Sequence, residues 1–128
     1  LPIRFTGFVP DVRPYVQAAD AYIIPLQVGG GTRIKVYEAM AMGCPVVSTS
    51  IGVEGLPVED NEHYLCADTP ERFAGRTLEL LAAPARGQAL AERAYRFVSG
   101  KFGAPAVVRR GEDSWSEAVE RKGRPQAR

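Results

Sequence analysis

Short runs of β-branched, aromatic and other apolar residues alternate along this chain with longer stretches in which apolar residues recur at helical spacing. The short runs predict strands, because they are rich in residues that favour extended structure and are bounded by proline, glycine or polar residues. They are residues 3–9, 21–25, 45–49 and, with a weaker pattern, 63–66. The run at 21–25 is continuously apolar, which is typical of a strand covered on both faces in a parallel sheet.

The stretches between these runs carry start and stop signals for helices. Asp11 is placed to cap a first helix, and Gly43 is placed to stop a second one. Proline opens each of two later helices, a position where its missing N–H costs nothing. The expected helices are residues 12–19, 32–42, 70–82 and 84–102.

The alternation of strand and helix predicts an α/β fold: a Rossmann-like parallel sheet with flanking helices and right-handed crossovers. In such a sheet the loops that leave the carboxyl ends of the strands gather along one edge, and ligands bind there. The loops in question are residues 9–11, 26–31 and 50–56. Candidate chemistry is therefore expected in these three loops.

The chain has 128 residues with 45% hydrophobic content, which fits a single domain. We expect the domain to span residues 1–120 and the polar residues 121–128 to form a disordered tail. A last helical segment is expected over residues 104–121, and its apolar stripe, part of which would be exposed, offers a surface for self-association. The chain opens on Leu-Pro without a starting methionine, so we expect a piece of a longer protein.

Charge and cysteine usage narrow the class of protein. The formal net charge is +1, which gives no general field to attract nucleic acid or a membrane surface. No apolar run approaches the roughly 20 residues of a membrane span, and the first residues of this sequence do not show the basic, then apolar, then small-residue pattern of a signal peptide. Cys44 and Cys66 lie in apolar surroundings without metal-ligand spacing, so we expect free thiols in a reducing compartment, the cytoplasm.

The glycines at positions 29–31 lead directly into the second predicted helix. Glycine backbone can take positive φ and bring N–H groups close to an anion, and the positive end of the helix points at the same place. Arg33 and Lys35 add formal charge there. The loop is thus a candidate phosphate site, although a flexible connection ahead of a capped helix would have the same sequence.

Glu38 is the one acid of an otherwise apolar part of that helix. A carboxylate removed from water requires a hydrogen-bond donor or a cation as its partner. Lys35, one turn earlier, could form a structural ion pair with it, in the weaker of the two orientations. The adjacent hydroxyls of a ribose are the other candidate, because the roughly 10 Å of helix rise from Gly31 to Glu38 matches the reach of a nucleotide diphosphate. Both interpretations stay open at this point.

The remaining polar residues give weaker signals. His63 is the one histidine, and without a triad-like partner we expect it to have a structural role. The acids Glu54, Glu59, Asp60 and Glu62 predict a solvated turn rather than a metal site. Glu54 is kept as a possible ligand-binding residue, because it lies in the third loop of the predicted edge.

The stretch from Thr6 to Leu56, and above all GGGTRIK followed by EAMAMGCPVV, resembles the nucleotide-sugar-binding C-terminal domain of GT-B fold retaining glycosyltransferases, group 1 type. The resemblance implies a UDP- or GDP-sugar donor and no metal or other cofactor. It also implies roles for individual residues. The diphosphate would meet the amides of Gly30, Gly31 and Thr32 and the cations Arg33 and Lys35; Glu38 would bind the ribose; and Phe8 and Val9 would border the base.

The chain also departs from that family. Many relatives carry another glutamate that contacts the donor sugar, and counting back from Glu38 places Gly30 at its position. The upstream glycine loop of the domain and the N-terminal acceptor domain have no counterpart here. We therefore expect a fragment that binds donor but transfers no sugar by itself.

The resulting hypothesis is the donor-binding part of a glycosyltransferase that moves a sugar from a nucleotide diphosphate sugar to an acceptor hydroxyl, in glycan or cell-surface polysaccharide biosynthesis. Two alternatives remain. A nucleotide-sugar epimerase of the same two-domain fold would release an altered donor without any acceptor. A non-catalytic protein-interaction module with a decayed nucleotide site would bind a partner through its terminal apolar stripe.

Overall fold

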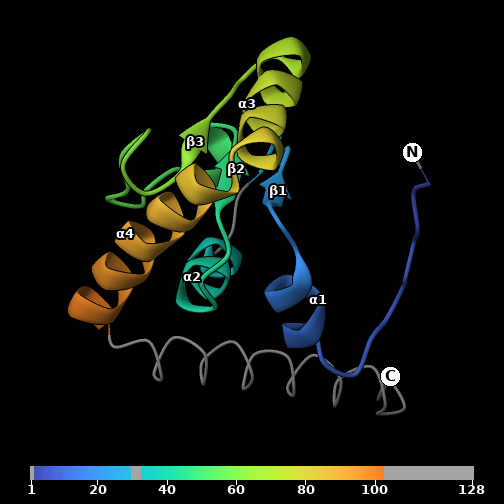
Figure 1. The fold of residues 1–128 in the computed structure, drawn as a ribbon, viewed down its shortest axis with the longest axis horizontal. Coiled ribbons are helices and arrows are strands. Elements are labelled where there is room, and N and C mark those ends of the chain that lie inside the picture. The colour runs from blue at the N-terminus through green and yellow to red at the C-terminus, as the bar shows by residue number, and fades with distance from the viewer. Residues whose placement is uncertain (1, 30–32, 103–128) are drawn as a thin grey trace, which may run out of the picture.

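The computed structural model describes residues 2–29 and 33–102. Within these ranges a three-stranded parallel sheet in the order β1-β2-β3 forms the centre of the molecule (Figure 1). Its strands are Tyr22–Ile24 (β1), Val46–Ser48 (β2) and Leu65–Cys66 (β3). Tyr22 lies opposite Val46, and Val47 lies opposite Leu65. The expected α/β fold with a parallel sheet is confirmed.

Helices precede, connect and follow these strands. They are Arg13–Ala18 (α1), Ile34–Ala41 (α2), the short 3-10 helix Ile51–Val53 (η1), Pro70–Ala82 (α3) and Pro84–Phe102 (α4). Two of them, α3 and α4, have the predicted bounds. At the start of α3 the Thr69 hydroxyl accepts a hydrogen bond from the Arg72 N–H at 3.2 Å. At the end of α2, Gly43 takes a φ of +73°, so it stops the helix as predicted.

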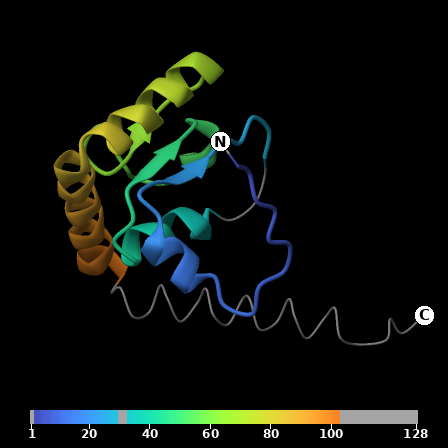
Figure 2. The ribbon, with the colours of Figure 1, turned by 45° about the vertical axis from the view of Figure 1, so that its right-hand side comes forward.

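The side chains of β2 alternate between the two faces of the sheet and so join two different cores. Val46 packs with Val36 and Met40 of α2 on one face. Val47 packs with Leu80 of α3 on the other face. The sheet therefore lies between α2 and α3, an arrangement that Figure 2 shows from the side.

Helix α4 contributes to both cores. Its Leu90 belongs to the cluster with α3, whereas Ala94 and Val98, one and two turns further on, belong to the cluster with α2. The helix thus passes from one layer to the other along the β3 side of the sheet, as Figures 1 and 2 agree. This helix closes the β3 side and leaves the β1 side open.

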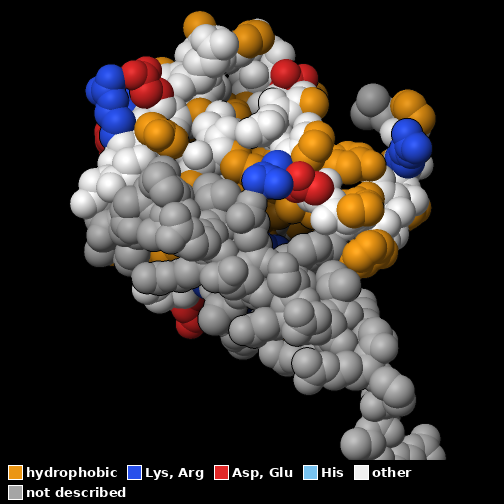
Figure 3. Space-filling model, turned by 90° about the horizontal axis from the view of Figure 1, so that it is seen from below, with side chains coloured by type: hydrophobic (Ala, Val, Ile, Leu, Met, Phe, Trp, Pro, Cys, Tyr) orange, Lys and Arg blue, Asp and Glu red, His pale blue; other side chains and the backbone are white. Residues whose placement is uncertain are grey.

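Residues 3–9 do not form the predicted strand. Ile3 and Phe5 are 80% and 93% exposed, and the segment is an extended trace that stands apart from the sheet (Figure 1). The local pattern of this segment suits a strand, but a strand also requires a neighbour to receive its backbone hydrogen bonds. None of the described strands is such a neighbour. Exposed hydrophobic side chains consequently gather over this part of the surface, which Figure 3 shows from below.

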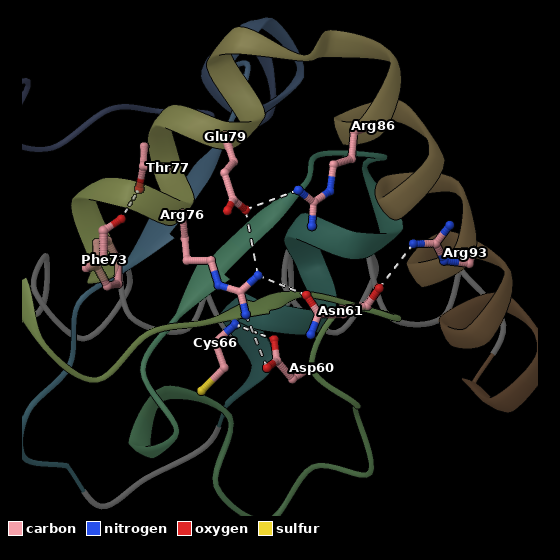
Figure 4. A network of polar contacts seen from close by, with 9 residues as sticks. All are labelled: Asp60, Asn61, Cys66, Phe73, Arg76, Thr77, Glu79, Arg86 and Arg93. Carbon is pink, nitrogen blue, oxygen red and sulfur yellow. Dashed lines mark hydrogen bonds and ion pairs between the residues drawn. The ribbon is translucent and has the colours of Figure 1, made fainter. Parts of the chain in front are cut away.

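The loop before β3 is held by arginines from two helices (Figure 4). Arg76 of α3 donates to Asn61 Oδ1 at 2.9 Å and lies 3.5 Å from Asp60 Oδ2. Arg93 of α4 donates to the Asn61 carbonyl at 3.2 Å. Asp60 in turn accepts the N–H of Cys66 at 2.8 Å, so its carboxylate occupies the outer edge of β3. The solvated turn that the sequence predicted is confirmed, since Glu59, Asp60 and Glu62 are exposed, and Asp60 within it also clamps the loop to α3 and β3.

His63 has the structural setting that the sequence predicted. Its Nδ1 accepts a hydrogen bond from the Glu59 N–H at 3.0 Å. Its ring packs on Phe97 of α4, with 4.4 Å between the ring centroids. The imidazole thereby connects the loop before β3 to the long helix.

Candidate functional site

The loops that leave the three strands are fastened to one another at the carboxyl edge of the sheet. The hydroxyl of Thr49, after β2, donates to the carbonyl of Leu26, after β1, at 2.5 Å. The N–H and the hydroxyl of Ser50 both donate to Asp68 Oδ1, after β3, at 2.8 and 3.0 Å. The edge is thus a defined surface. Sequence reasoning missed Thr49, Ser50 and Asp68, although hydroxyl residues directly after a buried strand were a signal for this role.

Arg33 lies within this edge, immediately before α2. Its side chain is only 10% exposed, and its Nη2 donates to the carbonyl of Gly29 at 3.2 Å. The same nitrogen lies 3.9 Å from Oε2 of Glu54, which follows η1. The structure therefore brings together two predicted site residues, Arg33 and Glu54, from different loops. No acceptor among the described residues reaches the buried Nε of Arg33.

Glu38 projects from the second turn of α2 and is half-buried. Burial raises the pKa of its carboxyl above the ordinary value, and the positive charge of Lys35 partly opposes the rise. Within the described part of the chain, no donor hydrogen bonds to this carboxylate and no cation pairs with it within 4.0 Å. The structural Lys35–Glu38 ion pair, one of the two interpretations of the sequence, is therefore not formed.

The surroundings of Glu38 place it near the edge strand of the sheet. The pKa of Tyr22, on β1, is raised by burial and then by the negative charge of Glu38. Glu38 of α2 therefore lies close enough to Tyr22 to affect its charge state, and Tyr22 belongs to β1, the edge strand of the described sheet.

The remaining predicted site residues are distributed as follows. Lys35 is exposed in the first turn of α2. Phe8 is 60% exposed and Val9 is half-buried. The segment that carries these two residues runs on the same side of the molecule as the loop after β1 (Figure 2). Gly30, Gly31 and Thr32 lie outside the described residues, as do residues 104–121 with the predicted apolar stripe.

A cavity of about 290 Å³ lies at the opposite edge of the sheet, where the strands begin. Asp20, Pro45, Leu81 and Gln88 are among the residues that line it. None of the predicted site residues does so. The candidate site is accordingly an open edge of the sheet and is separate from this cavity.

Other kinds of site receive no support from residues 2–29 and 33–102. Among them no cluster of three or more His, Cys, Asp and Glu side chains is arranged to hold a metal ion. Both cysteines are free, as predicted, and Cys44 is buried. No helix in the described ranges has the length and apolar character needed to cross a membrane.

A three-stranded parallel sheet with flanking helices, and with charged residues on the loops at its carboxyl edge, defines a Rossmann-like class of α/β domain. Comparison with known families makes this class specific. Residues 2–83, which are more than half of the chain, match the family of group 1 glycosyl transferases, and the chain belongs to that family.

A similar protein aligns with a longer part of the chain than the family match does. The chain is 29% identical over 108 residues to the lipopolysaccharide core biosynthesis glycosyltransferase LpsE of Rhizobium meliloti. The aligned region covers 83% of the chain but 32% of LpsE. The chain therefore spans about a third of the length of this relative.

Proposed function

We propose that this chain is the donor-binding part of a glycosyltransferase that transfers a sugar from a nucleotide diphosphate sugar to an acceptor hydroxyl. The observation that carries the proposal is the Glu38 carboxylate, half-buried, near Tyr22 of β1 and without a hydrogen-bond donor among the described residues. A carboxylate accepts hydrogen bonds from two adjacent hydroxyls at once, which is what a ribose offers. The hydroxyls of a bound ribose would supply the hydrogen-bond donors that Glu38 lacks among the described residues.

The diphosphate of the donor would then lie toward the start of α2. The exposed ammonium of Lys35 and the guanidinium of Arg33 supply positive charge there, and the first-turn amides of a helix favour an anion. We assign the amides of Gly30, Gly31 and Thr32 to the same group, and Phe8 and Val9 to the border of the base. These amides and cations stabilise the negative charge that grows on the diphosphate as the glycosidic bond breaks.

We further propose that the acceptor belongs to a cell-surface polysaccharide or another glycan. The support for this is the name of LpsE, which acts in lipopolysaccharide core biosynthesis. The two free thiols support a cytoplasmic site of action, because a reducing compartment keeps cysteines unpaired. In this proposal the acceptor is held by a separate domain, so the chain by itself transfers no sugar.

Calorimetric titration of the purified chain with UDP and with GDP tests the proposal. One of the two nucleotides should bind saturably, and Glu38→Gln should weaken it by about tenfold or more, the usual worth of hydrogen bonds to a charged group. Glu59→Gln is the matched control, since Glu59 is an exposed acid in the loop before β3. Absence of binding by a chain with a cooperative melting transition, or equal effects of the two substitutions, would refute the donor-site assignment.

A further inference from the structure

We propose that Glu54 recognises the hydroxyls of the donor sugar and that Arg33 is the positioning residue that holds it there. The inference rests on the proposed function, and it adds a role for each member of an ion pair that links two loops of the candidate site. Sequence reasoning assigned Arg33 to the diphosphate and kept Glu54 as a possible donor-binding residue, without naming the part of the donor that it contacts. The geometry points to a division of labour between them.

The backbone that carries Glu54 is firmly placed. Gly52 and Val53, the residues just before it, are buried against the ends of the strands. A side chain at position 52 would overlap the hydroxyl of Ser48, so the turn lies as close to β2 as glycine permits. The Glu54 N–H donates to the Ile51 carbonyl at 3.2 Å, which closes η1. Glu54 therefore projects from a rigid corner of the edge.

The two partners of the ion pair differ in exposure, and the difference argues against an ordinary surface salt bridge. Glu54 is 71% exposed, whereas the Arg33 side chain is nine-tenths buried. A cation at that depth is held by its surroundings, here by the Gly29 carbonyl and by Glu54. The guanidinium keeps this orientation although no described residue accepts from its Nε. Its position is thus governed by the two loops that it joins.

The charge of Glu54 decides which part of the donor it can face. An exposed carboxylate repels a diphosphate, and it accepts hydrogen bonds readily from neutral hydroxyl groups. Gly29, the other contact of Arg33, adjoins the part of the glycine loop that we assign to the diphosphate. The sugar is the neutral group attached to that diphosphate, so it is the part of the donor that a carboxylate next to Arg33 would meet.

Calorimetry with nucleotides and nucleotide sugars tests this role. The probes are UDP, UDP-glucose, GDP and GDP-mannose, and the measured quantity is the ratio of dissociation constants between the nucleotide and its sugar conjugate. Glu54→Gln should reduce the preference for the conjugate by about fivefold or more and leave the affinity for the bare nucleotide equal or higher. Glu59→Gln is again the matched control and should leave the ratio unchanged.

The positioning role of Arg33 has its own readout. Arg33→Lys keeps the positive charge but loses the guanidinium Nη2, which both donates to the Gly29 carbonyl and lies 3.9 Å from Glu54. It should lower the preference for the sugar conjugate in the native background and produce no further drop in a Glu54→Gln background. Equal losses in the two backgrounds would show that Arg33 does not act through Glu54.

The outcomes separate this inference from the proposed function. Binding of nucleotide that depends on Glu38, with a sugar preference that ignores Glu54, would overturn the role of Glu54 and leave the donor site standing. Absence of any nucleotide or nucleotide-sugar binding by the folded chain would overturn both. A fall in affinity for bare nucleotide in Glu54→Gln would also contradict the inference, because it would assign Glu54 to the nucleotide instead.

Discussion

Replacement of Gly52 by alanine should destabilise the domain, although the same change in an open position does the opposite. An added methyl group would overlap Ser48 Oγ and would lie 3.1 Å from Cγ2 of Ile24. Ser48 is fully buried, and its hydroxyl donates to the Thr49 carbonyl at 2.8 Å, so it cannot rotate away without losing that bond. Overpacking of this kind costs about 1–3 kcal/mol, and the lost hydrogen bond adds about 1 kcal/mol. We expect a net loss of about 2–3 kcal/mol.

The melting temperature reports this loss directly. An unfolding entropy of about 2.1 cal/mol/K per residue implies a drop of about 4 °C for each kcal/mol in a chain of this length, hence about 8–12 °C for Gly52→Ala. Gly75→Ala in α3 is the control, because nothing lies within 4 Å of the added methyl group, and it should stabilise the protein by about 0.5–1 kcal/mol.

A double-mutant cycle isolates the contact itself. Ser48→Ala removes the overlapped oxygen, so the cost of Gly52→Ala should fall by about 1 kcal/mol or more in that background. Strictly additive effects of the two substitutions would refute the packing argument. A Gly52→Ala protein as stable as the native chain would refute it as well, since it would show that the turn moves freely.

Two further predictions concern titratable groups. Burial raises the pKa of Glu38 in the folded protein above its ordinary 4.5, so the folded state binds this proton more tightly than the unfolded state. The free energy of unfolding that this proton contributes is therefore lost as the pH rises through the folded pKa. Glu38→Gln should therefore become progressively more stable relative to the native chain in urea titrations taken from about pH 4 to about pH 7, and a constant difference would contradict this account. Burial raises the pKa of Cys44 to about 11, so a thiol reagent at neutral pH should label the half-exposed Cys66 first and reach Cys44 only after unfolding. Mass spectrometry of the labelled peptides measures the order, and labelling of Cys44 in the folded protein would contradict the prediction.

Features that depend on neighbours in the chain were predictable from the sequence. The bounds of α3 and α4 follow from Thr69 as a cap and from Pro70 and Pro84 at the first position of each helix. Gly43 stops α2 for the same kind of local reason. The half-burial of Glu38 was also readable, because the apolar residues around it on one helix leave little polar surface.

The tertiary structure decided what depends on residues far apart. Residues 3–9 have the composition of a strand, but none of the strands in residues 2–29 and 33–102 lies beside them, and a hydrogen-bonded ladder requires both members. The acids before β3 form the predicted exposed turn, but its attachment to Arg76 of α3 through Asp60 and Asn61 appears only in the folded chain. No local pattern could have shown these outcomes, since each arises from packing between separate elements.

The candidate site also has features that the sequence predicted and features that only the tertiary structure decided. The sequence by itself was enough to nominate the candidate residues, because a glycine loop, flanking cations and a lone helical carboxylate follow one another within a single βα unit. Only the folded chain paired Arg33 with Glu54, left Glu38 without a partner among the described residues and required glycine at position 52. The physical reason is that helix signals act between residues a turn apart, whereas a ligand site is assembled where the ends of different strands meet.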